Sequence, residues 1–98
     1  MANYKLSNTA KEDLIRIHQF GVQKFGMKQA DKYFNEFFDA FERIAKRPFS
    51  YEPVDYVKNG YRRCVSGSDS IYFRIESNTV EIMTIIGKQD LEKLKNSW

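Results

Sequence analysis

The chain has 98 residues, which fits a single domain over residues 1–98 and leaves no room for a second one. Its 42% hydrophobic and 30% charged residues exclude a disordered chain. The formal net charge of +3 permits nucleic-acid binding but is too small to indicate it.

Targeting signals are not evident in the sequence. Cys64 is the only cysteine, so no intramolecular disulfide can form, as suits a reducing compartment. The first residues lack the apolar core of a signal peptide, and no stretch approaches the roughly 20 apolar residues of a membrane span. We therefore expect a cytoplasmic protein that does not contact membranes.

The first half of the chain predicts one short strand and two helices. Residues 4–7 alternate apolar and polar side chains, as a strand does. Thr9 and Glu12 then have the spacing of a capping box that begins a helix, and Gly26 ends it. The apolar stripe of this helix comprises Leu14, Ile17, Gly21 and Phe25.

A second helix is expected from residue 27 to just before Pro48, with a strong 3.6-residue period. Its apolar positions are Ala30, Tyr33, Phe34, Phe37, Phe38, Phe41, Ile44 and Ala45. Because the link between the two helices is so short, they must form an antiparallel hairpin.

The second half predicts a connecting loop over residues 48–59 and three strands over residues 61–65, 71–76 and 79–86. A short charged helix follows at residues 90–96. The fold class is therefore α+β, in the order β-α-α-β-β-β. An antiparallel sheet packs on the helical hairpin, and a short C-terminal helix or tail follows.

Strict alternation along the last strand places Val80, Ile82 and Ile86 on one face and Met83 and Ile85 on the other. The sheet face away from the hairpin then carries Tyr72, Arg74, Met83 and Ile85. This face is too apolar for solvent and too charged for a core. We expect the C-terminal tail, a partner chain, or both in turn to cover it.

Few side chains suggest catalysis. His18 has no second histidine or cysteine to share a metal, and Cys64 has no histidine at motif spacing, so both indicate structural roles. We expect no cofactor. Arg62 and Arg63 are adjacent in a strand and leave on opposite faces, so at least one of them should have a specific partner.

An ordered set of motifs resembles the ParE toxins of type II toxin–antitoxin modules over nearly the whole chain. The motifs are Leu6-Ser7 before a helix with Ala10 and Asp13-Leu14, Gly60-Tyr61-Arg62-Arg63, Ile71-Tyr72-Phe73-Arg74-Ile75, and Val80-Glu81-Ile82 leading to Ile85-Ile86-Gly87-Lys88-Gln89-Asp90. The resemblance implies the RelE/ParE fold and a cytoplasmic toxin associated with plasmid stabilisation.

The superfamily contains two activities, and the resemblance implies a choice between them. RelE-like members are ribosome-dependent mRNA endonucleases with basic residues and a C-terminal Tyr or His, whereas ParE-like members resemble inhibitors of DNA gyrase. Residues 87–98 contain neither Tyr nor His. Arg62 or Arg63, Arg74 and Lys88 could match the basic residues, but arginine is a poor base.

The sequence thus favours a gyrase inhibitor without catalytic residues. Two alternatives stay open: a RelE-like ribonuclease that uses Tyr61 or Tyr72, and a non-toxic member that only binds its antitoxin.

Two candidate interfaces follow. The proposed gyrase-binding residues are Arg62, Arg63, Arg74, Lys88 and Trp98. The proposed antitoxin-binding residues are Tyr72, Met83, Ile85, Leu91 and Leu94. The resemblance implies a ParD-like antitoxin whose disordered tail folds on binding, and an oligomer formed with it. We expect no sequence-specific nucleic-acid binding by the toxin alone.

Overall fold

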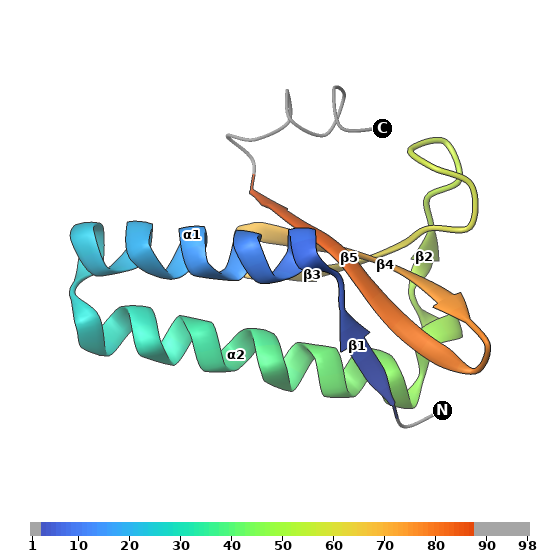
Figure 1. Cartoon of the computed structure of the whole chain (residues 1–98), viewed down its shortest axis with the longest axis horizontal. Helices are drawn as coiled ribbons and strands as arrows, with labels where there is room; N and C mark the ends of the chain where they lie inside the picture. Colours follow the sequence, from blue (N-terminus) through green and yellow to red (C-terminus); the bar gives the residue numbers. More distant parts are fainter. Residues whose placement is uncertain (1–2, 88–98) are drawn as a thin grey trace.

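The structure, a computed structural model, describes residues 3–87, which form two long helices and a five-stranded sheet (Figure 1). The predicted C-terminal helix and the site candidates Lys88, Leu91, Leu94 and Trp98 lie outside the described residues. In chain order the elements are β1 (Tyr4–Leu6), α1 (Asn8–Phe25), α2 (Met27–Lys46), the 3-10 turn η1 (Pro48–Ser50), β2 (Glu52–Pro53), β3 (Arg62–Ser66), β4 (Asp69–Glu76) and β5 (Thr79–Gly87).

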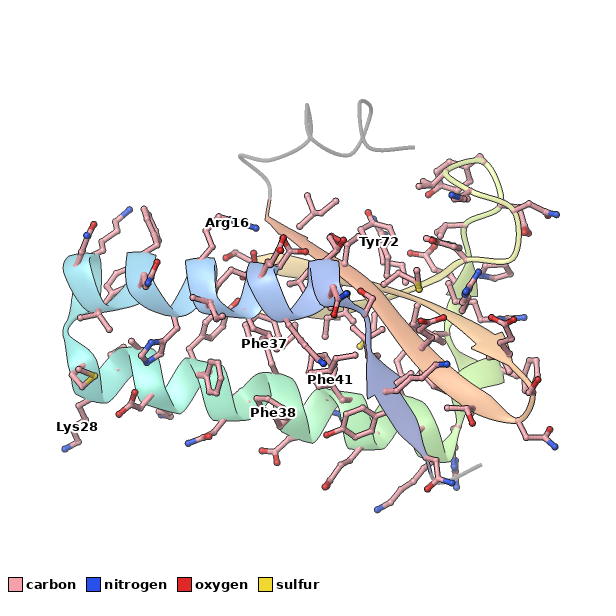
Figure 2. All side chains as sticks on the ribbon, in the orientation of Figure 1. Arg16, Lys28, Phe37, Phe38, Phe41 and Tyr72 are labelled. Carbon is pink, nitrogen blue, oxygen red and sulfur yellow. The ribbon has the colours of Figure 1, made fainter. Side chains whose placement is uncertain are left out.

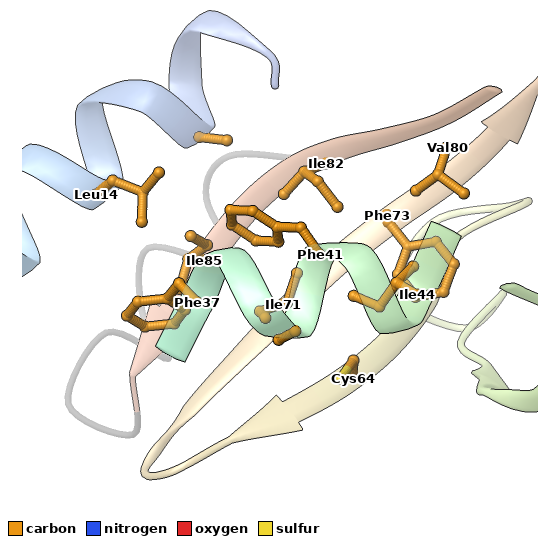
Figure 3. Packing of buried hydrophobic residues seen from close by; sticks show 12 residues of the cluster. Leu14, Phe37, Phe41, Ile44, Cys64, Ile71, Phe73, Val80, Ile82 and Ile85 are labelled. Carbon is orange, nitrogen blue, oxygen red and sulfur yellow. The ribbon is translucent and has the colours of Figure 1, made fainter. Parts of the chain in front are cut away.

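The sheet has the strand order β1-β5-β4-β3-β2, and the hairpin of α1 and α2 packs on one of its faces. Strands β3 to β5 pair antiparallel as predicted, and β2, which lies in the predicted loop over residues 48–59, adds a short antiparallel strand to β3. Strand β1 runs parallel to β5, with Tyr4 opposite Val80. Figure 3 shows the core between the two layers, where Phe37 and Phe41 of α2 are fully buried against Ile71 and Ile82. The predicted core positions of these two rings are confirmed.

Helix α1 begins two residues earlier than the capping box predicted. Ser7, not Thr9, is the N-cap, and its hydroxyl accepts a hydrogen bond of 3.0 Å from the amide of Ala10. The same hydroxyl donates to the carbonyl oxygen of Met83 at 2.7 Å. A bond to β5 therefore selects the helix start, and the spacing of Thr9 and Glu12 could not reveal that bond.

Strand β5 contains a bulge at Met83. Phe73 of β4 pairs with Ile82, but the preceding Tyr72 pairs with Thr84, which leaves Met83 as an extra residue. The alternation of side chains shifts at this point, so Ile85 lies in the core under the hairpin. Placing Ile85 on the outer face beside Met83 was wrong, because strict alternation takes no account of a bulge.

The outer face of the sheet is covered in part by the chain itself. Val54 and Tyr61, at the two ends of the segment between β2 and β3, pack with Tyr72 and Ile86 in a second buried cluster. Asp55 closes this segment by accepting the amide hydrogen of Gly60 at 2.7 Å. Residues 54–61 therefore supply part of the cover. The predicted cover from the C-terminal tail lies outside the described residues, and cover by a partner stays a prediction.

Candidate functional site

Strand β3 places Arg62 and Arg63 on opposite faces of the sheet, as predicted. The Nη1 atom of Arg62 donates to the carbonyl oxygen of Tyr51 at 2.6 Å, and its guanidinium lies 5.2 Å from the centre of the Phe49 ring. Arg62 therefore has a specific partner on the hairpin side of the sheet edge.

Arg63 and Arg74 lie on the outer face, and each is paired with carboxylates. Arg63 binds Glu52 at 2.6 Å, and Arg74 binds Glu81 at 2.8 Å and Glu76 at 2.9 Å. The hydrogen bond to Glu81 raises the pKa of Arg74. The three arginines do not form one cluster, and their contact with gyrase stays a prediction.

The proposed antitoxin residues are also separated. Tyr72 and Ile85 are both buried, on opposite faces of the sheet, and only Met83 of the three described candidates keeps partly exposed surface. Tyr72 hydrogen-bonds the side chain of Arg63. The outer face is thus a smaller candidate surface than the sequence suggested.

A different apolar surface, which we call the hairpin groove, lies where the hairpin extends beyond the sheet (Figure 1). Its volume is about 450 Å³, within the range of ligand pockets. Phe20 and Phe25 in its wall are 51% and 63% exposed. The lining residues are Arg16, Ile17, His18, Phe20, Gly21, Phe25, Gln29, Ala30, Tyr33, Phe34, Ser68 and Asp69.

One end of the hairpin groove is polar, where α2 meets the turn between β3 and β4. The Tyr33 hydroxyl donates to Asp69 Oδ2 at 2.5 Å, and the carbonyl oxygen of Ser66 lies 3.0 Å from it. Burial, followed by the hydrogen bond to Asp69 and its negative charge, raises the pKa of Tyr33 to about 12. Gly67, with φ of +60°, lets the turn approach this phenol, since a Cβ there would lie 2.7 Å from its oxygen.

The two helices are held together along the groove. His18 of α1 bonds Asp31 of α2 at 2.7 Å, which accounts for this histidine structurally, as predicted. Close packing adds to this, because a Cβ on Gly21 would lie 3.3 Å from that of Ala30.

Cations lie around the apolar wall. The ammonium of Lys24 lies over the rings of Phe20 and Phe25, at 5.5 and 5.7 Å from their centres. Arg16 lines the groove as well, and Figure 2 shows Lys28 near the tip of the hairpin. An apolar groove with basic flanks can bind an acidic amphipathic helix. Among residues 3–87 no group of three His, Cys, Asp or Glu side chains could hold a metal ion.

Sequence reasoning missed this groove. Phe25 was predicted to lie on the core-facing stripe of α1, but it is exposed because the sheet does not reach that end of the hairpin. The available signal was Phe20, a large apolar residue outside the stripe. The polar end of the groove is formed by Tyr33 and Asp69, which are 36 residues apart, and no sequence pattern links them.

Solved structures of other proteins share this architecture. A chromosomal ParDE toxin–antitoxin system from P. aeruginosa matches with a TM-score of 0.77 at 19% identity, over 89% of this chain and 96% of the other. The toxin–antitoxin complex RelBE2 from Mycobacterium tuberculosis matches with a TM-score of 0.58 at 18% identity, over 89% of this chain and 98% of the other. This chain therefore has the fold seen in these ParDE and RelBE2 toxin–antitoxin structures.

Sequence comparison narrows the class. Residues 4–95 match the family described as "ParE toxin of type II toxin-antitoxin system, parDE". Toxin ParE1 of Caulobacter vibrioides is 37% identical over 86 residues, which cover 88% of each chain. Toxin ParE1 of Mycobacterium tuberculosis is 27% identical over 87% of this chain and 88% of the relative. This chain belongs to the ParE toxin family of type II toxin–antitoxin systems.

No helix within residues 3–87 combines the length and the apolar character that crossing a bilayer requires.

Proposed function

We propose that this ParE toxin inhibits DNA gyrase by binding to it in the cytoplasm, without a chemical reaction of its own, and that a ParD-like antitoxin neutralises it. The observation that carries the proposal is membership of the ParE family over residues 4–95. The exposed surface is suited to binding, since it combines arginines, large aromatic rings and an apolar groove.

The environments of Tyr61 and Tyr72 support this choice over a ribonuclease. Both tyrosines are 4% exposed, because Tyr61, at the end of the segment between β2 and β3, packs with Tyr72 in one buried cluster. Burial raises the pKa of Tyr61, which makes its phenol a weaker acid at neutral pH. A side chain that exchanges a proton with RNA must contact the RNA, and the burial of these two tyrosines prevents such contact.

The decisive experiment is a supercoiling assay with purified gyrase. The protein should inhibit supercoiling and accumulate cleaved DNA at micromolar concentration. A chain lacking residues 88–98 should lose this effect and still bind the antitoxin. Translating ribosomes treated with the same protein should keep their message intact. Codon-specific cleavage that depends on Arg74 would instead assign the ribonuclease activity.

The antitoxin site that we propose is the hairpin groove. An amphipathic helix with acidic and apolar side chains would place its apolar residues against Phe20 and Phe25, and its carboxylates would meet Lys24 and Arg16. A disordered antitoxin tail that folds on binding suits such a groove.

This site is tested by Phe25→Asp, with Ile15→Asp as the matched control. Ile15 is also on α1 and is 58% exposed, but it does not line the groove. Titration calorimetry with the antitoxin should show at least about tenfold weaker binding for Phe25→Asp and little change for Ile15→Asp. Equal losses would reject the groove. Met83→Asp tests a further contact on the outer face, where we expect weaker binding as well.

A further inference from the structure

A second surface, which we call the basic corner, forms where α2 ends. Arg43, Lys46 and Arg47 belong to the last turn and C-cap of α2, and the pairing of β2 with β3 brings Arg62 to the same corner. The Arg43 side chain hydrogen-bonds Tyr51, whose carbonyl oxygen accepts from Arg62. Tyr51 thus links the two arginines.

This corner holds an excess of positive charge, although Glu42 and Glu52 flank it in sequence. Residues 43–51 contain three basic and no acidic side chains, and Arg62 makes the fourth cation. The remaining chain has twelve basic and thirteen acidic residues, so its formal charge is −1. Among the described residues, the nearby Glu52 is engaged by Arg63. The C-terminus of a helix favours basic side chains. That preference does not account for Arg62, which lies on β3.

An exposed aromatic ring lies among these cations. Phe49 is 65% exposed in η1, and the guanidinium of Arg62 lies over its ring. A large apolar ring kept at the surface beside four cations offers a stacking platform next to phosphate-binding groups. Proteins that bind single-stranded nucleic acid without sequence preference combine these two features.

We propose that the basic corner binds single-stranded nucleic acid, with phosphates held by Arg43, Lys46 and Arg47 and one base stacked on Phe49. Nothing in this arrangement reads base edges, so binding is independent of sequence. The proposal does not depend on gyrase inhibition, and either can fail alone.

The test is fluorescence anisotropy with labelled single-stranded DNA, single-stranded RNA and duplex DNA of about 12 nucleotides. The single strands should bind at low salt. The logarithm of the association constant should fall by about 0.7 per phosphate contact for each tenfold rise in salt concentration. Both single strands carry the phosphates and bases that the corner recognises, so the tighter-binding one of single-stranded DNA and single-stranded RNA is identified as the ligand. Stronger binding of the duplex would overturn the stacking role of Phe49.

Three variants make the assignment specific. Phe49→Ala should weaken single-strand binding about tenfold or more and leave the salt slope unchanged. Arg47→Gln should reduce the slope by about 0.7. Lys28→Gln removes the same charge at the hairpin tip, far from the corner (Figure 2), and should change neither. Absence of binding at low salt, or equal effects of Lys28→Gln and Arg47→Gln, would overturn the proposal.

Discussion

Asp13 is a carboxylate that α1 buries almost completely, at 1% exposure. Its Oδ2 accepts from the Thr84 hydroxyl at 2.6 Å and from the Ile85 amide at 3.1 Å. Strand β1 ends at Leu6, so within residues 3–87 no strand pairs with the edge of β5 beyond the bulge on that side. Asp13 satisfies this buried amide, and its Oδ1 accepts from Nη2 of Arg16 at 3.2 Å, so hydrogen bonds and an ion pair account for a charge in the interior.

Replacing Asp13 with alanine should lower the free energy of unfolding by about 1–3 kcal/mol, since the buried amide of Ile85 then has no side-chain acceptor. Thr84→Val is the matched comparison, because it removes one donor and keeps the bond to Ile85. Urea unfolding measures both variants. If Asp13→Ala is no more destabilising than Thr84→Val, the Ile85 bond contributes little.

Tyr33 should make stability depend on pH in the alkaline range. Its pKa is about 12 in the folded protein, above the ordinary value of 10.0, so the folded state keeps the proton longer than the unfolded state. The stabilisation is fully present below pH 10 and is lost as pH rises toward 12. The stability difference between wild type and Tyr33→Phe should therefore shrink over this range.

Urea unfolding of both proteins at several pH values checks this. Tyr4, Tyr51 and Tyr61 also have raised pKa values, but they titrate in both proteins and cancel in the difference. A difference that stays constant from pH 10 to 12 would show that the phenol does not titrate as the contact with Asp69 implies.

At the scale of elements, α2 supplies much of the core. Phe37 and Phe41 are one turn apart, fully buried, and stacked with ring centres 6.5 Å apart. Phe37→Ala or Phe41→Ala should cost about 3–5 kcal/mol in unfolding free energy, because each leaves a cavity between hairpin and sheet. Phe25→Ala, on the exposed part of α1, should change stability by less than about 0.5 kcal/mol. Similar losses for all three would contradict this division of the hairpin.

For the whole molecule, the two layers should unfold together. The hairpin and the sheet share one apolar core, so neither buries its inner face alone. Helix content from far-UV circular dichroism and aromatic packing from near-UV signals should give the same urea midpoint. Separate midpoints would mean that the hairpin is stable without the sheet.

The sequence alone determined the two helices, their hairpin and the inward rings Phe37 and Phe41. These features follow from a 3.6-residue period and from glycine at a helix end, which are local properties of the chain. The predicted strands over residues 71–76 and 79–86 leave only Ser77 and Asn78 between them, and both residues adopt positive φ in the turn.

Only the tertiary structure decided the face of Ile85, the start of α1 and the groove. Ile85 turns inward because of the bulge at Met83. The amide of Ile85 is then satisfied by Asp13, 72 positions away in the chain. Ser7 caps α1 while bonded to β5, and Tyr33 meets Asp69 only when the hairpin lies against the sheet. Periodicity reports which residues are apolar, whereas packing between distant segments decides which of them stay at the surface.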